Sequence, residues 1–220
     1  MMTLRNQLEH FCFLNISRKD PCVTFYILGV QLPSSCVDIA LGVDHTLFLC
    51  TGGTVFSCGL NTFHQLGHHP PPPLLLAPVP ISAKSSAPKY PAAVGVAAAK
   101  VHSVFWTDDS LYTWGLNAGQ LGHLRGDKTI IQPKLVSSLT RDKICLVSVS
   151  DGATVALTAK GDVMALYEYN TKKLGQRQHN IVAMSVTGGQ LDHCSGRVGK
   201  RVKFNVEEFD FKVIKISQAE

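Results

Sequence analysis

The sequence lacks the marks of several common classes of protein. None of its seven cysteines forms a Cys-x-x-Cys pair, and the odd count does not suit a complete disulfide framework. The first ten residues contain no apolar h-region, and apolar runs such as residues 25–30 are far too short to span a membrane. Helical spacing at i, i+3 and i+4 is not sustained. These absences predict a β-rich globular protein in a reducing compartment, the cytoplasm and also the nucleus.

Motifs that would indicate catalysis are also missing. There is no Gly-x-Ser-x-Gly, and the glycines of residues 115–122 do not match Gly-x-Gly-x-x-Gly. The pair Asp108 and Asp109 fits a hairpin turn better than an acid–base dyad. His64, His68 and His69 have no cysteine or carboxylate nearby in sequence, so a zinc site is disfavoured. We expect no enzymatic activity, no cofactor, no metal and no small-molecule substrate.

Charge is sparse and uneven. Only 17% of the residues are charged, and the net charge is +5. The last fifty residues are rich in basic side chains, among them Lys172, Lys173, Arg177, Arg197, Lys200, Arg201 and Lys203. A mild excess of this kind is typical of a solvated face, so we do not expect a nucleic-acid or membrane partner.

What the sequence does contain is an internal repeat. Residues 111–123 read Leu-Tyr-Thr-Trp-Gly-Leu-Asn-Ala-Gly-Gln-Leu-Gly-His, and residues 55–68 read Val-Phe-Ser-Cys-Gly-Leu-Asn-Thr-Phe-His-Gln-Leu-Gly-His. The matched glycines are 115 − 59 = 56 positions apart. His45 and His102 precede the two copies in nearly the same register, and an eroded third copy has Ala153 in place of the histidine.

Each copy reads as short strands rich in β-branched and aromatic residues, separated by Gly, Asp or Ser turns. Three to four such strands in every 50 to 60 residues are typical of propeller blades. The predicted fold is therefore all-β, an incomplete open β-propeller of three to four blades.

The predicted domain limits follow from the repeat. Residues 1–35 form an ill-defined segment or part of a preceding blade, the blades are residues 36–69, 93–139 and 144–192, and residues 193–220 form a basic tail. Residues 181–189 fit the opening strand of a fourth blade. Neither end shows an obvious cap, so we expect an open arc with an exposed end on each side.

The pattern Gly-x-x-His-Thr-Leu, a turn, and then Val-Phe-Ser-x-Gly-x-Asn-x-x-x-Gln-Leu-Gly resembles the regulator of chromosome condensation repeat. This resemblance implies a protein-interaction propeller. Within the family, the residues most resemble a regulator that binds and inhibits a Bruton-type tyrosine kinase. That regulator is also, together with ankyrin and BTB domains not visible here, a substrate adaptor of a cullin-RING ubiquitin ligase. The alternative is a guanine-nucleotide exchange factor or chromatin-binding propeller.

Two sets of candidate residues result. The repeat itself predicts structural positions, with the histidines used for packing and turn hydrogen bonds and the glycines at tight turns or close blade contacts. They are His45, Gly59, Asn61, Gln65, Gly67, His102, Trp114, Gly115, Asn117, Gln120 and Gly122.

The second set consists of possible interaction loops: Pro70, Pro71, Pro72 and Pro73 in one, and Arg125 and Asp127 in the other. We interpret the proline run, with the prolines that follow it up to Pro91, as a lengthened connection between blades. A docking segment for a proline-binding domain is the alternative.

Overall fold

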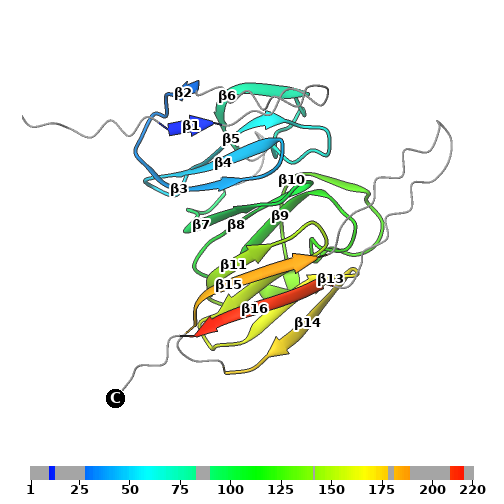
Figure 1. Ribbon diagram of the computed structural model, residues 1–220. Coiled ribbons are helices and arrows are strands. Elements are labelled where there is room, and N and C mark those ends of the chain that lie inside the picture. The colour runs from blue at the N-terminus through cyan, green and yellow to red at the C-terminus, as the bar shows by residue number, and fades with distance from the viewer. Residues whose placement is uncertain are drawn as a thin grey trace, which may run out of the picture.

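Three four-stranded antiparallel sheets form the body of the protein in a computed structural model, which describes residues 10–12, 28–82, 90–140, 142–177, 181–188 and 209–215 (Figure 1). The first sheet consists of β3 (Cys36–Leu41), β4 (His45–Cys50), β5 (Val55–Leu60) and β6 (Leu74–Pro80). The second consists of β7 (Gly95–Ala98), β8 (His102–Trp106), β9 (Leu111–Leu116) and β10 (Thr129–Leu135). The third consists of β11 (Ile144–Val149), β12 (Thr154–Thr158), β13 (Val163–Tyr167) and β14 (Asn170–Gly175). A short 3-10 helix, Ser137–Leu139, leads from the second to the third.

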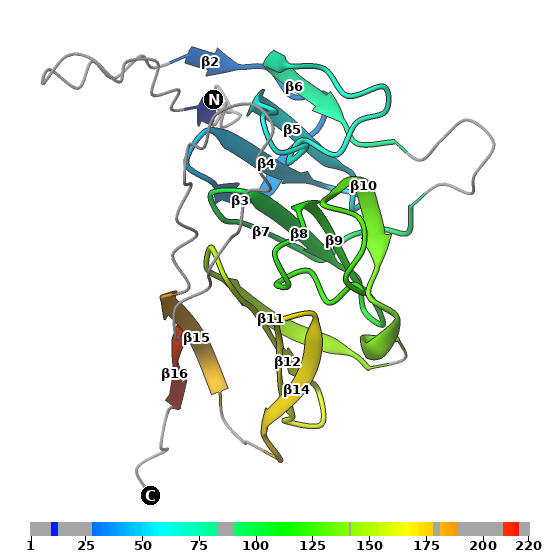
Figure 2. The same ribbon diagram turned by 90° about the vertical axis from the view of Figure 1, so that its right-hand side faces the viewer.

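The sheets succeed one another as blades, with their first strands adjacent: β3 contacts β7, and β7 contacts β11 (Figures 1 and 2). Alternation along β8 explains how one strand serves two interfaces. Phe105 packs toward the first sheet, whereas Val104 and Trp106 pack toward the third. The predicted open propeller is confirmed.

The outer face of the third sheet is covered by the segment in which the sequence analysis expected the opening strand of a fourth blade. β15 (Ile181–Gly188) pairs with β16 (Phe209–Lys215) and lies against β11 (Figure 2). It covers the apolar face of the third sheet that points away from the second. Val155 and Leu157 there are almost fully buried, and Val186 of β15 packs into the same cluster.

The N-terminal end is covered only in part. β1 (His10–Cys12) and β2 (Leu28–Val30) form a ribbon beside β5 and β6 (Figures 1 and 2). Phe48 and Phe56, on the face away from the second sheet, are buried together with Leu32. Along β3, however, Val37 and Leu41 remain 60% and 54% exposed. The exposed end predicted by the sequence is thus reduced to one strip of the first strand.

Part of the proline-rich stretch is a regular strand, where the sequence analysis expected an irregular connection throughout. Its part 74–80 is β6, the fourth strand of the first sheet, so this sheet extends beyond the predicted limit at residue 69. Pro78 and Pro80 are tolerated because β6 is an edge strand and needs fewer backbone donors.

The loop before β6, residues 68–73, has the same length as its counterpart 123–128 before β10. The four prolines therefore replace residues in an ordinary repeat loop and do not lengthen it. Pro88 lies outside the described residues, as does most of the predicted basic tail.

In the described part of the chain, no helix is long and apolar enough to cross a membrane.

Candidate interaction rim

The repeated histidines join neighbouring sheets. His45 begins β4, and its Nε2 lies 2.7 Å from Oγ of Ser103 in the second sheet. His102 begins β8, and its Nε2 lies 3.2 Å from Oγ1 of Thr154 in the third. Each histidine thus reaches the hydroxyl residue that follows its own repeat position in the next blade. At Ala153 this link is absent, because the methyl group of alanine cannot form a hydrogen bond.

The partner of His45 shows that its Nε2 carries a hydrogen, and burial keeps the ring neutral. The Ser103 hydroxyl donates its only hydrogen to the Gln65 carbonyl at 2.8 Å, so it accepts from the His45 Nε2–H. Burial lowers the pKa of His45 to about 4. Burial and then the proximity of His45 lower the pKa of His102 to about 3. Both rings are neutral near pH 7, which favours a packing role over acid–base chemistry.

Gly59 and Gly115 lie inside strands and not in turns as expected. They stand opposite His45 and His102 in the β4–β5 and β8–β9 ladders. Their φ values of 113° and 110° belong to the left-handed region that glycine adopts most easily. A Cβ on Gly115 would lie 2.5 Å from the Val101 carbonyl oxygen, so only glycine fits.

Gly67 and Gly122 mark close contacts between blades. A Cβ on Gly67 would lie 2.8 Å from Nε1 of Trp114, which donates to the Gln65 carbonyl at 2.8 Å. Trp114 is fully buried between the first and second sheets. In the eroded third sheet, Leu166 takes the corresponding place beside Gly122.

The Asn and Gln of each repeat shape the loop that follows the third strand. Asn61 accepts from the Leu66 amide through Oδ1 at 2.9 Å and donates through Nδ2 to the Pro72 carbonyl at 2.6 Å. Asn117 donates to the Asp127 carbonyl at 3.0 Å and to the Leu124 carbonyl at 3.4 Å.

The glutamines fold the first part of each loop in the same way. Gln65 accepts from the Phe63 amide at 2.8 Å, and Gln120 accepts from the Ala118 amide at 2.9 Å. The repeat residues are therefore occupied in holding loops.

Ser57 and Thr113 belong to the same scaffold, although the sequence analysis did not single them out. Ser57 Oγ donates to the Leu66 carbonyl and accepts from His68 Nε2, both at 2.8 Å. Thr113 makes the matching contacts with the Leu121 carbonyl and His123. Their equivalence in the aligned repeats, two residues before the glycine, was the available signal.

The two predicted interaction loops are equivalent loops of adjacent blades. Residues 69–71 and 73 are exposed, and residues 124–128 are exposed throughout. We call these two loops together the rim. The structure thus brings the proline run and the pair Arg125 and Asp127 to corresponding places in the first and second sheets.

Two further residues, one in the rim and one beside it, were missed because nothing in the sequence marks them. Leu124 is 87% exposed, the most exposed of the large apolar residues described. Tyr169, in the turn between β13 and β14, lies under the Arg125 guanidinium, with Cζ 5.6 Å from the ring centroid. Only the tertiary structure brings residues 125 and 169 together.

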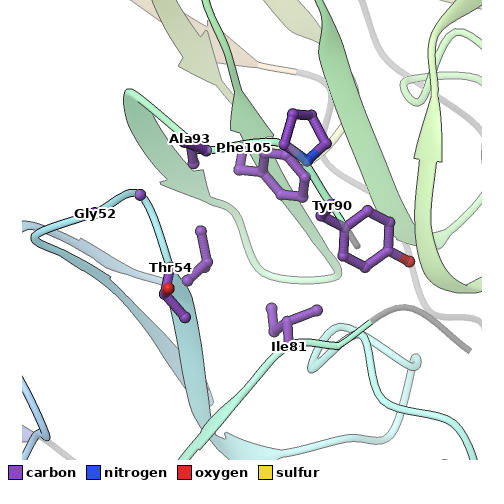
Figure 3. A pocket seen from close by; sticks show the side chains of 10 residues that line it. Gly52, Thr54, Ile81, Tyr90, Ala93 and Phe105 are labelled. Atoms are coloured by element: carbon purple, nitrogen blue, oxygen red, sulfur yellow. The ribbon is translucent and has the colours of Figure 1, made fainter. Parts of the chain in front are cut away.

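A cavity of about 270 Å³ lies between the first and second sheets, lined by Gly52, Thr54, Ile81, Tyr90, Ala93 and Phe105 among others (Figure 3). The Tyr90 hydroxyl points away from Gly52 and Thr54 and donates to the Pro133 carbonyl at 3.3 Å. The residues that line this cavity include no carboxylate, imidazole or thiol.

The histidine cluster does not become a metal site in the described part of the chain, where no group of three potential ligands is found. His68 bonds to Ser57, and His64 occupies a left-handed turn position with φ of 61°. The helical face that would place His64 beside His68 is not formed.

Comparisons with known proteins agree with this geometry. The pattern of the regulator of chromosome condensation (RCC1) repeat matches residues 36–65, 52–106 and 108–157. The chain is 47% identical over 163 residues to the inhibitor of Bruton tyrosine kinase of Xenopus laevis, and 42% identical over 164 residues to that of Homo sapiens. Each alignment covers 72% of this chain but 12% of the relative.

Among solved structures, Prp20p of Saccharomyces cerevisiae superposes with a TM-score of 0.57 at 21% identity, covering 74% of this chain and 43% of Prp20p. At this identity the likeness concerns the fold alone. Repeat pattern, blade architecture and sequence identity together place the chain in the regulator of chromosome condensation (RCC1) repeat family.

Proposed function

We propose that this chain is a non-enzymatic interaction module that binds a Bruton-type tyrosine kinase through its rim and restrains the kinase. The single observation that supports binding through the rim is that the repeat side chains and the loop residues have different roles. Repeat side chains such as Asn61 and Asn117 hold the loops from inside, and the loop residues they hold face solvent. Loops fixed on a rigid scaffold commonly carry binding functions.

The identity of the partner rests on the two relatives named above. Because the chain spans about an eighth of their length, the kinase as partner is part of the proposal. A role in a cullin-RING ubiquitin ligase substrate adaptor is the second part of the proposal. It predicts that the chain co-purifies with a cullin scaffold.

The direct test uses the purified 220-residue chain. Its binding to the pleckstrin-homology and kinase domains of a Bruton tyrosine kinase is measured by calorimetry, and kinase activity is followed in parallel. We expect a Kd of about 1 μM or tighter and a fall in phosphorylation as the module saturates. No binding at concentrations well above that range would contradict the proposal.

The second candidate is the nucleotide-exchange or chromatin function of the alternative interpretation. The observation in its favour is the likeness to Prp20p, whose structure is described together with its binding to Gsp1p and histones. Since that likeness concerns the fold alone, we rank it lower. Absence of DNA binding even at low salt, where phosphate contacts are strongest, would dispose of the chromatin version.

A further inference from the structure

We propose that Leu124, Arg125 and Tyr169 form a preorganised docking point for a protein segment that places a carboxylate beside an apolar side chain. The proposal deepens the rim function proposed above by naming the residues and the chemistry of the partner. We call these three residues the docking triad.

Leu124 supplies the apolar anchor. At 87% exposed it leaves almost its whole side chain in water. The backbone that carries it is held in place, because Asn117 Nδ2 donates to the Leu124 carbonyl at 3.4 Å and to the Asp127 carbonyl at 3.0 Å. Burying this side chain under a partner removes apolar area from water without first ordering the loop.

Arg125 supplies the charge. Its guanidinium lies over the Tyr169 ring, with Cζ 5.6 Å from the ring centroid, within the range of a cation–π contact, which does not use the N–H donors. The N–H donors are thus available for a carboxylate in the bidentate geometry that arginine favours. No ion pair is found for Arg125 within the described ranges, where the bridges involve Lys160, Lys172 and Lys173.

Tyr169 holds the arrangement in place. It sits in the β13–β14 turn, where Glu168 and Tyr169 both have left-handed φ values, 50° and 63°. The Tyr169 amide donates to the Gly119 carbonyl at 3.0 Å, and its hydroxyl donates to the Asn117 carbonyl at 3.2 Å. A Cβ on Gly119 would come within 2.8 Å of the Tyr169 amide nitrogen. The turn of the third sheet is therefore docked on the loop of the second, and the stack survives without a partner.

The chemistry of the partner follows from this composition. The other exposed charges of this region balance: Lys128 stands next to Asp127 in the rim, and Lys172 pairs with Glu168 at 3.8 Å in the adjacent sheet. Arg125 is the cation that directly follows the exposed leucine in the chain. An acidic residue next to a leucine or phenylalanine complements both groups, whereas a basic or uncharged polar segment complements neither.

The test uses the full chain and two probes. The first is a set of short synthetic peptides in which a Glu pair adjoins a Leu or Phe, each matched by the same peptide with Gln in place of Glu. The second is the pleckstrin-homology and kinase-domain protein used above. The variants are Leu124→Asp, Arg125→Glu, Arg125→Lys and Tyr169→Phe. Leu76→Asp serves as a control, because Leu76 is an apolar residue 69% exposed on β6.

We expect the Glu peptides to bind more tightly than their Gln partners. Leu124→Asp and Arg125→Glu should each weaken binding about tenfold or more, and Leu76→Asp by less than about twofold. Arg125→Lys should lose most of the preference for Glu, because a lysine ammonium group cannot bind a carboxylate through two parallel N–H donors as a guanidinium does. Tyr169→Phe should weaken binding only a few fold, since it keeps the ring and loses one hydrogen bond.

Two results would overturn the inference: equal binding of Glu and Gln peptides, or unchanged binding of both probes by Leu124→Asp. Peptide binding without kinase binding would support the triad and contradict the kinase proposal. Kinase binding that is unchanged by all four variants would support the kinase proposal and contradict the docking triad. Unchanged thermal unfolding of the exposed-site variants shows that any loss reflects the surface and not the fold.

Discussion

Single residues carry the connection between blades, and His45 is the clearest case. Its neutral ring is enclosed, its Nε2 bonds to Ser103, and its Nδ1 has no partner. Protonation would place a charge on a buried group that cannot be solvated. The histidine therefore makes the inter-blade contact sensitive to acid.

Acid should destabilise the protein through His45. Its folded pKa of about 4 lies below the unfolded value of about 6.5, so the unfolded state takes up the proton first. The contribution of His45 to the free energy of unfolding is fully present above pH 6.5. It falls by on the order of 3 kcal/mol as the pH drops from there to about 4. Urea unfolding at several pH values measures this.

His45→Gln provides the comparison, because the amide can still donate to Ser103 but does not titrate. The variant should lose less stability than the wild type over the same range. If both curves had the same slope between pH 6.5 and 4, His45 would not be the group responsible.

Gly115 is the second residue whose role is decided by local geometry. Gly115→Val should lower the free energy of unfolding by about 3 kcal/mol or more, because a side chain meets the Val101 carbonyl and the φ of 110° is unfavourable for valine. Gly126→Ala is the control, since a Cβ there meets nothing within 4 Å. Equal melting temperatures of the two variants would refute this account.

At the scale of one element, each rim loop is tied to its blade by an asparagine. Asn61→Ala removes the acceptor of the Leu66 amide and the donor to the Pro72 carbonyl. We expect a loss of about 1–2 kcal/mol and faster hydrogen exchange at Leu66. Thr62→Ala, at the exposed neighbouring position, should change neither quantity. Protection of Leu66 that is the same in both variants would count against the loop description.

The sequence predicted the elements better than the connections. The strand–turn–strand units around Trp114 were visible because alternation and turn residues are local signals. β6 was missed because Pro78 and Pro80 disfavour a strand, and only its edge position makes them acceptable. The sequence analysis placed Gly59 and Gly115 at tight turns or close blade contacts; it did not place them inside strands, since the residue opposite each is a histidine from another strand.

At the scale of the whole molecule, the ribbon β15–β16 replaces a neighbouring blade. Val186→Asp would put a charge into the cluster formed with Val155 and Leu157. We expect a loss of several kcal/mol and association of the exposed faces, seen by chromatography with light scattering. Ser185→Asp, at the exposed position beside it, should leave the protein monomeric and stable. An equally well-folded Val186→Asp protein would mean that the ribbon does not cover the third sheet.

By itself the sequence determined the repeat, the all-β class and the recurring Asn, Gln and Gly positions, because these depend on spacing and turn chemistry within one unit. The tertiary structure decided which hydroxyl each histidine reaches, which end is covered, and that Arg125 stacks on Tyr169 beside Leu124. Those contacts join residues from different blades. Their geometry is set by how the sheets stack, and that information is not contained in any one stretch of the chain.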